Sequence, residues 1–119
     1  MTREELFPKS EFPLQITTHF LFAEWMVEVD YYYENPFLGD HKQNSGKEFR
    51  FFNRSGESIL ELTTICEYGN TYRKFQKTPG GIIELTDAGY SKLANLHLDI
   101  FEKFSAIAEV LAKTRWRPL

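Results

Sequence analysis

Residues 49–86 read FRFFNRSGESILELTTICEYGNTYRKFQKTPGGIIELT, a series of short apolar runs separated by turn-forming residues. The separators supply the Gly, Pro, Asn and Ser residues that favour tight turns, and they lie at Arg54–Glu57, Gly69–Asn70 and Thr78–Gly81. The runs between them are rich in the β-branched and aromatic residues that fit a pleated sheet. We therefore predict a β-meander over residues 47–85.

One of these runs, Ser58–Tyr68, also allows a helical interpretation. It contains Ile59 and the segment Thr63–Cys66, however, and β-branched residues and cysteine are poor helix formers. The strand interpretation is therefore favoured. Cys66 is the only cysteine and shares the parity of the apolar positions in this run, so we expect a buried structural thiol rather than a reactive one.

The N-terminal part of the chain carries the alternation of a β-hairpin. Even positions are mainly apolar over Phe12–Phe22, and odd positions are apolar or aromatic over Trp25–Tyr33. A period of two is typical of strands that are buried on one face. We expect the turn near Ala23 and Glu24. The segment 34–46 contains Asn-Pro, Gly-Asp and Asn-Ser-Gly, and we predict a loop there.

The last part of the chain has the pattern of an amphipathic helix. Thr86 is a suitable N-cap, and Asp87 would place a carboxylate in the first turn, where it interacts favourably with the helix dipole. The candidate core positions recur at spacings of three and four, namely Leu93, His97, Ile100, Phe104, Ile107 and Leu111. We predict one helix on the order of 40 Å long. Because one small sheet cannot cover that length, we expect the helix to pair with a second copy in a homodimer.

Together these elements predict an α+β fold, with an antiparallel sheet of five to six strands followed by one long C-terminal amphipathic helix. A chain of 119 residues has the size of a single domain. Within it we expect an N-terminal segment and β-hairpin, a loop, a β-meander and a helix, over residues 1–33, 34–46, 47–85 and 86–114 respectively.

The net charge of −3 is unevenly distributed. Residues 1–46 carry three basic and eight acidic side chains, whereas residues 47–119 carry eleven basic and nine acidic ones. Only the second part could present a basic face to a nucleic acid, and its excess of positive charge is small. The acidic first part would suit a basic protein surface.

Neither catalysis nor metal binding has a signature in this chain. His19, His41 and His97 lie far apart and do not form a metal-ligand spacing. We therefore expect a non-enzymatic protein without a cofactor or metal. No apolar run approaches the ~20 residues that cross a bilayer, and the first residues lack the features of a signal peptide. We expect a cytoplasmic protein that does not bind membranes.

The order EFRFF, ILELTTICEYGN, TYRKFQKTPGG, IIELT and DAGYSKLANLHLDIFEKF, over residues 47–113, resembles a known layout. It is similar to the four strands and helix of the PC4-like family of transcriptional coactivator and single-stranded DNA-binding domains. The family has a turn that ends in glycine, then a short strand that ends in Leu-Thr, then a helix that opens with aromatic-x-x-Leu. The corresponding residues of this chain are Gly81, Leu85, Thr86, Tyr90 and Leu93. The N-terminal hairpin has no counterpart in the family's minimal domain.

The resemblance implies that aromatic and basic residues on the sheet bind single-stranded DNA or RNA. Unpaired bases would stack on the rings while Arg and Lys follow the phosphates. The implied nucleic-acid-binding residues are Arg50, Phe52, Arg54, Tyr72, Arg73, Lys74 and Lys77.

A protein-binding role of the inhibitor or immunity type is the main alternative. In this hypothesis an acidic, tyrosine-rich surface covers a basic surface on a partner, with Tyr as anchors and the acids steering association. Its residues are Glu28, Asp30, Tyr31, Tyr32, Tyr33, Glu34 and Asp40. Two further alternatives are a winged-helix regulator, which ELTDAGYSKL also resembles, and a site for a small apolar ligand between sheet and helix.

Overall fold

The computed structural model describes residues 1–33, 45–67 and 70–113. The chain divides into two compact units, Met1–Leu85 and Thr86–Leu119. Among the described residues, the first unit contains a short helix and six strands, and the second contains two helices. The elements are α1 (Arg3–Leu6), β1 (Leu14–Leu21), β2 (Trp25–Tyr33), β3 (Ser45–Asn53), β4 (Ser58–Glu67), β5 (Asn70–Thr78), β6 (Gly81–Glu84), α2 (Asp87–Leu96) and α3 (Leu98–Lys113).

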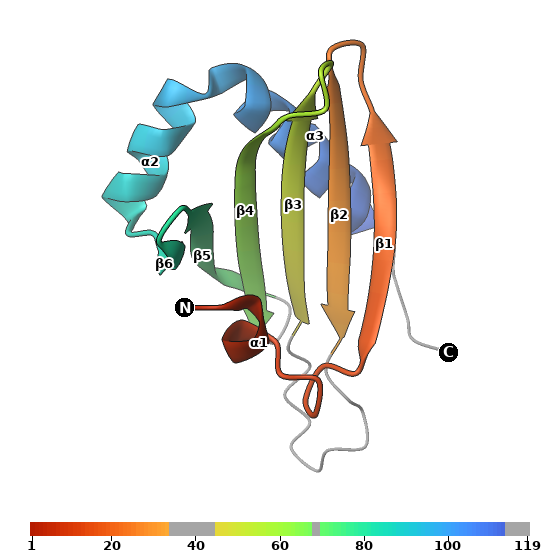
Figure 1. The fold of residues 1–119 in the computed structure, drawn as a ribbon, viewed down its shortest axis with the longest axis vertical. Coiled ribbons are helices and arrows are strands. Elements are labelled where there is room, and N and C mark those ends of the chain that lie inside the picture. The colour runs from red at the N-terminus through yellow and green to blue at the C-terminus, as the bar shows by residue number, and fades with distance from the viewer. Residues whose placement is uncertain (34–44, 68–69, 114–119) are drawn as a thin grey trace. The chain divides into compact units, whose positions relative to one another are not determined.

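The six strands form one antiparallel meander in the order β1-β2-β3-β4-β5-β6 (Figure 1). The prediction of an antiparallel sheet in an α+β chain is thereby confirmed. The turn between β1 and β2 lies where the alternation placed it, and it is closed by a 2.8 Å bond from the Phe22 amide to the Trp25 carbonyl. β3 begins at Ser45, so the predicted loop is shorter at that end, and residues 34–44 lie outside the described residues.

One face of the sheet is apolar because of the alternation within each strand. Its buried side chains come from β2, β3 and β4 and include Val27, Val29, Phe49, Phe51, Leu60 and Leu62. Their register is regular, with Val27 opposite Phe51 and Val29 opposite Phe49. Cys66 is also buried, as predicted.

The other face is polar, and the segment before β1 packs on one end of it. Phe7 is buried and stacks on Tyr32, with ring centroids 4.3 Å apart and an interplanar angle of 3°. Phe12 meets the edge of the Phe7 ring. The Phe7 ring lies on Gly46, where an added Cβ would be 2.0 Å from the nearest ring atom. The glycine therefore provides the space that this ring occupies.

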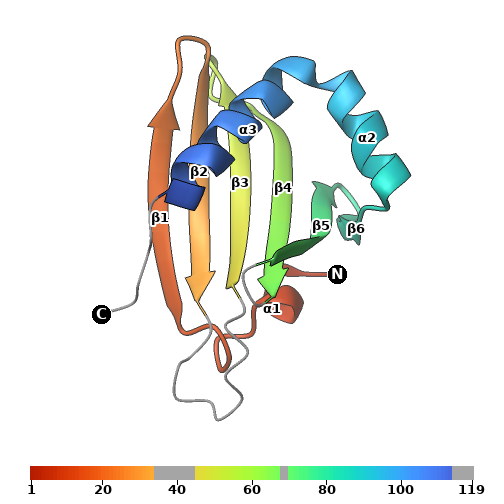
Figure 2. The same ribbon diagram turned by 180° about the vertical axis from the view of Figure 1, so that it is seen from behind.

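The prediction of one long C-terminal helix is wrong, because α2 ends and α3 begins around His97 (Figure 2). His97 has φ −131° and ψ 53°, which is not helical, and caps α2. No Gly or Pro marks the break, but Asn95, His97 and Asp99 are weak helix formers at alternate positions. The predicted N-cap is present, since the Thr86 hydroxyl accepts a 3.0 Å bond from the Gly89 amide.

The break removes the premise for dimerisation through the helix. That expectation rested on a single rod too long for one sheet, and the chain instead has helices of 10 and 16 residues. Within this unit Tyr90 and Phe101 pack edge to face, with ring centroids 5.3 Å apart, and join the two helices. Within α3 the Lys103 ammonium pairs with the Asp99 carboxylate one turn earlier, at 2.5 Å.

Gly46→Ala is expected to lower the free energy of unfolding by about 1–3 kcal/mol, because the new methyl group overlaps the Phe7 ring. Urea denaturation measures the effect. The matched control is Gly46→Ala in a Phe7→Ala background, where the ring is absent and the added methyl group should cost much less. Equal costs in the two backgrounds would show that the ring does not lie on Gly46.

Candidate functional site

The polar face of the sheet is ordered in rows of register partners across β1, β2 and β3. At one end Gln15, Tyr32 and Gly46 form a row that Phe7 covers. At the opposite end Leu21, Met26 and Phe52 form an apolar row. Two rows of charged and hydroxyl side chains lie between them, and their members are Thr17, His19, Glu28, Asp30, Glu48 and Arg50.

Arg50 is the centre of this ionic network. Its guanidinium group donates from Nε to Glu28 Oε1 at 2.9 Å, and Nη2 donates to both Glu28 and Asp30. Nη1 reaches Glu48 Oε2 at 3.4 Å. Asp30 and Glu48 are 3% and 6% exposed, so these charges are removed from bulk water. One arginine thus binds three carboxylates from two strands.

Further side chains complete the bonding of the carboxylates. The Thr17 hydroxyl donates to Asp30 at 2.6 Å, and the Tyr32 hydroxyl donates to Glu48 at 2.7 Å. Arg3 of the N-terminal segment pairs with the same Glu48 carboxylate at 2.7 Å. This contact connects the N-terminal segment to the network, as Phe7 connects it to Tyr32.

The pKa values follow from these bonds. Hydrogen bonds from Arg50 hold the pKa of Glu28 below its ordinary value, against the effect of burial. Burial raises the pKa of Asp30, but hydrogen bonds from Arg50 and Thr17 outweigh it and the net shift is downward. Burial would lower the pKa of Arg50, yet its bonds to Asp30 and Glu28 raise it. All three groups are therefore charged at neutral pH.

The ionic network is suited to holding strands together rather than to catalysis. Its three carboxylates already receive bonds from Arg50, Arg3, Thr17, Tyr32 and the ring of His19, which lies 3.0 Å from Glu28. The pKa values of Glu28 and Asp30 are lowered by their hydrogen bonds from Arg50, whereas a general acid at neutral pH has a raised pKa. Within residues 1–33, 45–67 and 70–113, no group of three His, Cys, Asp or Glu residues is placed to hold a metal ion.

An open groove of about 430 Å³ lies at the apolar end of the face. The β1–β2 and β3–β4 turns, which Figure 1 shows at the same end of the sheet, form its walls. Leu21 is 80% exposed, and the other large side chains are half-buried or exposed. We call this surface the end groove, and its principal residues are Leu21, Phe22, Trp25, Met26, Phe52 and Arg54.

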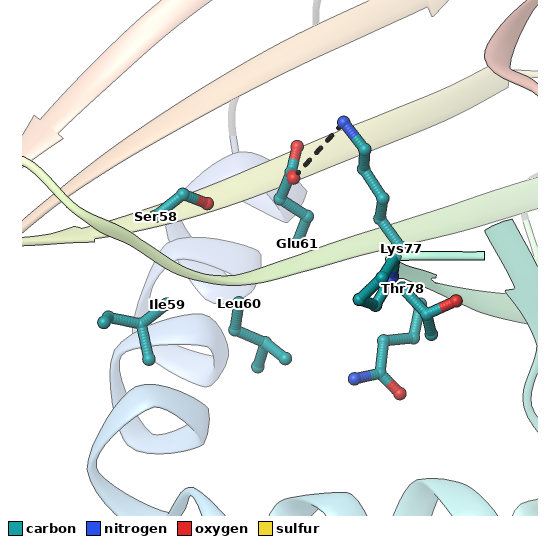
Figure 3. A pocket seen from close by; sticks show the side chains of 8 residues that line it. Ser58, Ile59, Leu60, Glu61, Lys77 and Thr78 are labelled. Carbon is teal, nitrogen blue, oxygen red and sulfur yellow. Dashed lines mark ion pairs between the residues drawn. The ribbon is translucent and has the colours of Figure 1, made fainter. Parts of the chain in front are cut away.

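The structure separates the predicted nucleic-acid-binding residues. Arg50 lies in the ionic network, and Arg73 pairs with Glu84 through bonds of 2.9 and 2.8 Å. Lys77 reaches Glu61 at 3.6 Å across a pocket of about 260 Å³, where β5 leaves β4 to pair with β6 (Figure 3). Lys74 has the opposite parity to Arg73, and the Tyr72 side chain lies outside the described part.

Phe52 and Arg54 are the two members of that set that lie together, and both line the end groove. Arg54 is exposed and donates from Nε to the Ala23 carbonyl at 3.1 Å, which joins the two turns that form the groove. Phe52 is the last member of the apolar row.

Most of the described residues that were predicted for protein binding are buried in the first unit or bonded within it. Glu28 and Asp30 belong to the ionic network, and Tyr31 and Tyr32 are 4% and 5% exposed. Tyr33 is half-buried and stacks on Tyr31, with ring centroids 5.7 Å apart. Glu34 and Asp40 lie outside the described residues.

Sequence reasoning missed four residues of the end groove, namely Leu21, Phe22, Trp25 and Met26. Their signal was available, since large apolar residues on both sides of a two-residue turn cannot all point into the core. The alternation of apolar and polar residues assigned these four residues to strands. It did not show which end of a strand is covered by other side chains and which end is exposed.

Comparisons of the chain with protein-family models, with curated proteins and with solved structures found no match. The PC4-like resemblance therefore stays a prediction. Among the helices of the described residues, none is long and apolar enough to cross a membrane.

Arg50→Met is expected to lower the free energy of unfolding at neutral pH by about 3–5 kcal/mol, because it leaves buried carboxylates without their partner. Urea denaturation measures this loss. Arg54→Met, which removes an exposed arginine, is the matched control and should cost much less. A loss for Arg50→Met no larger than the control's would contradict the importance of the network.

The pH dependence of stability is expected to change in the same variant. In the native protein the pKa values of Glu28 and Asp30 are lowered, so their stabilisation is present above the unfolded-state values of about 4 and is lost as the pH falls through the folded-state values. Without Arg50, burial dominates and raises the pKa of Asp30. Acidification from neutral pH toward about pH 5 should therefore stabilise the variant, and an unchanged pH profile would count against this account.

Proposed function

We propose that this protein is a non-enzymatic binding protein, and that it recognises another protein through the end groove. The observation that carries the proposal is the exposed apolar row at the end of an otherwise closed polar face. Leu21 projects an 80% exposed aliphatic side chain beside Met26 and Phe52, with Trp25 and Arg54 at the margin. Trp and Arg are the residue types enriched among energetic hot spots of protein interfaces.

The charge of the groove favours a protein over a nucleic acid. Its lining includes one acidic residue, Glu24, and one basic residue, Arg54. A nucleic acid strand is bound by several cations along its phosphates. Three of the five cations predicted for that purpose, Arg50, Arg73 and Lys77, bind carboxylates of the same chain.

The proposed ligand is a protein, as in the protein-binding hypothesis, but the binding surface is the end groove instead of the tyrosine-rich segment. The tyrosine side chains expected to act as anchors are mostly buried, whereas the end groove is open. A partner would insert an apolar side chain between the two turns, which the ionic network and the Arg54–Ala23 bond hold in place. A rigid groove loses little conformational freedom when it binds, which favours affinity.

A photo-crosslinking amino acid in place of Leu21 is expected to capture one protein partner in cells that express the chain. With that partner purified, Leu21→Lys should weaken binding at least about tenfold, whereas Leu21→Met should retain affinity because the side chain stays apolar. Isothermal titration calorimetry measures both. Ile83→Lys, which changes an exposed apolar residue of β6, is the control for general surface charge.

Equal affinity of Leu21→Lys and the native protein would exclude the end groove as the binding surface. Fluorescence anisotropy with labelled single-stranded DNA and RNA tests the competing class of ligand. Salt-dependent binding that is lost in Phe52→Ala and Arg54→Ala would assign the same groove to nucleic acid and overturn the proposal.

A further inference from the structure

The outer edge of β1 is an unpaired strand edge. In the described part of the chain, β1 is the first strand of the sheet and pairs with β2 alone. All eight of its residues have a partner in β2 and the register contains no shift, so the edge is regular along its length. Eight extended residues span about 27 Å.

The backbone groups that point away from the sheet can be assigned. The Phe22 amide donates to the Trp25 carbonyl, so residue 22 faces β2. In an antiparallel pair successive residues alternate between facing the neighbour and facing away. The amides and carbonyls of four residues therefore project outward from the edge, and these residues are Gln15, Thr17, His19 and Leu21.

The residues of β1 itself lack the sequence features that usually prevent two strand edges from pairing. Proteins protect such edges with lysine, proline, bulges or very short strands. The sequence of β1 is LQITTHFL, which contains no Lys, Arg, Asp, Glu or Pro. It is rich in β-branched residues, which favour strand pairing.

The opposite edge of the sheet is protected. β6 has four residues, and its outward Ile82 amide already donates to the Met1 carbonyl at 2.9 Å. Glu84 adds a charge to this edge strand. One edge is therefore open and the other is closed, so strand addition at β1 would not continue into a fibre.

We propose that β1 pairs antiparallel with β1 of a second copy of this chain. A symmetric pair satisfies both open edges at once and closes the assembly as a dimer. Because β1 carries no acidic, lysine or arginine side chain, no register of this pair places such like charges opposite each other. This interface replaces the one expected through the C-terminal helix and does not depend on what the end groove binds.

The outward groups restrict the register. Odd-numbered residues face outward, so they must pair with odd-numbered residues of the second copy. Centring the pair on Thr18 places Gln15 opposite Leu21 and Thr17 opposite His19 in the two copies, and forms about eight backbone hydrogen bonds. A centre on Thr17 would use Pro13, which has no amide to donate.

Sedimentation of the purified chain is expected to give a dimer, and His19→Pro should convert it to a monomer because it removes an outward amide. His19→Val is the matched control, since it also loses the contact with Glu28 but keeps the amide. Circular dichroism verifies that both variants are folded. A monomeric native protein, or a folded His19→Pro variant that remains a dimer, would overturn the proposal.

Disulfide trapping tests the register and does not depend on the proline variant. Thr18→Cys should form a cross-linked dimer under mild oxidation, because the two copies of residue 18 are direct neighbours across the two-fold axis. Ile16→Cys lies on the same face, but its two copies would be about 14 Å apart along the strands and should not cross-link. Efficient cross-linking at residue 16 and none at residue 18 would exclude this pairing.

Discussion

The rest of the first unit depends on one guanidinium group. Arg50 binds carboxylates from its own strand and from β2, and so joins β2 and β3 on the polar face of the sheet. Three buried or half-buried acids without this partner would repel one another and would require water. The network is satisfied because Thr17, Tyr32, Arg3 and His19 contact the remaining carboxylate oxygens. Through Arg3 it also fixes the segment before β1.

The ionic network lies between the two surfaces that we propose to bind other proteins. It binds Arg50, Glu28 and Asp30, which were predicted for a nucleic-acid or acidic interface, and Phe7 closes the face at one end. Two surfaces that the network leaves accessible in the described part of the first unit are the apolar row at the other end and the outer edge of β1. The apolar row lies where the polar face ends, and the β1 edge lies where the sheet ends. Neither surface is therefore visible in the sequence as a cluster of charged residues.

The alternation of apolar residues and the turn-forming residues predicted the hairpin with its turn at Ala23 and Glu24 and the meander over residues 47–85, and Thr86 followed by Asp87 predicted the helix cap, because each depends on neighbouring residues. The network was not predictable in this way, since Arg50 and Glu28 are 22 positions apart and meet only in one strand register. The break at His97 has no Gly or Pro signal. The position of Phe7 depends on Gly46, which appeared in the sequence as part of a loop.

The carboxyl pKa values of Glu28 and Asp30 test the central role of Arg50 most directly. Carbon-detected NMR titration of the two side-chain carboxyl groups measures both in the native protein. The account predicts midpoints below the ordinary values of about 4.3 for Glu and 3.9 for Asp, because Arg50 stabilises the charged forms. Midpoints at or above those values would mean that burial outweighs the guanidinium, and would contradict the network as the interaction that organises this face.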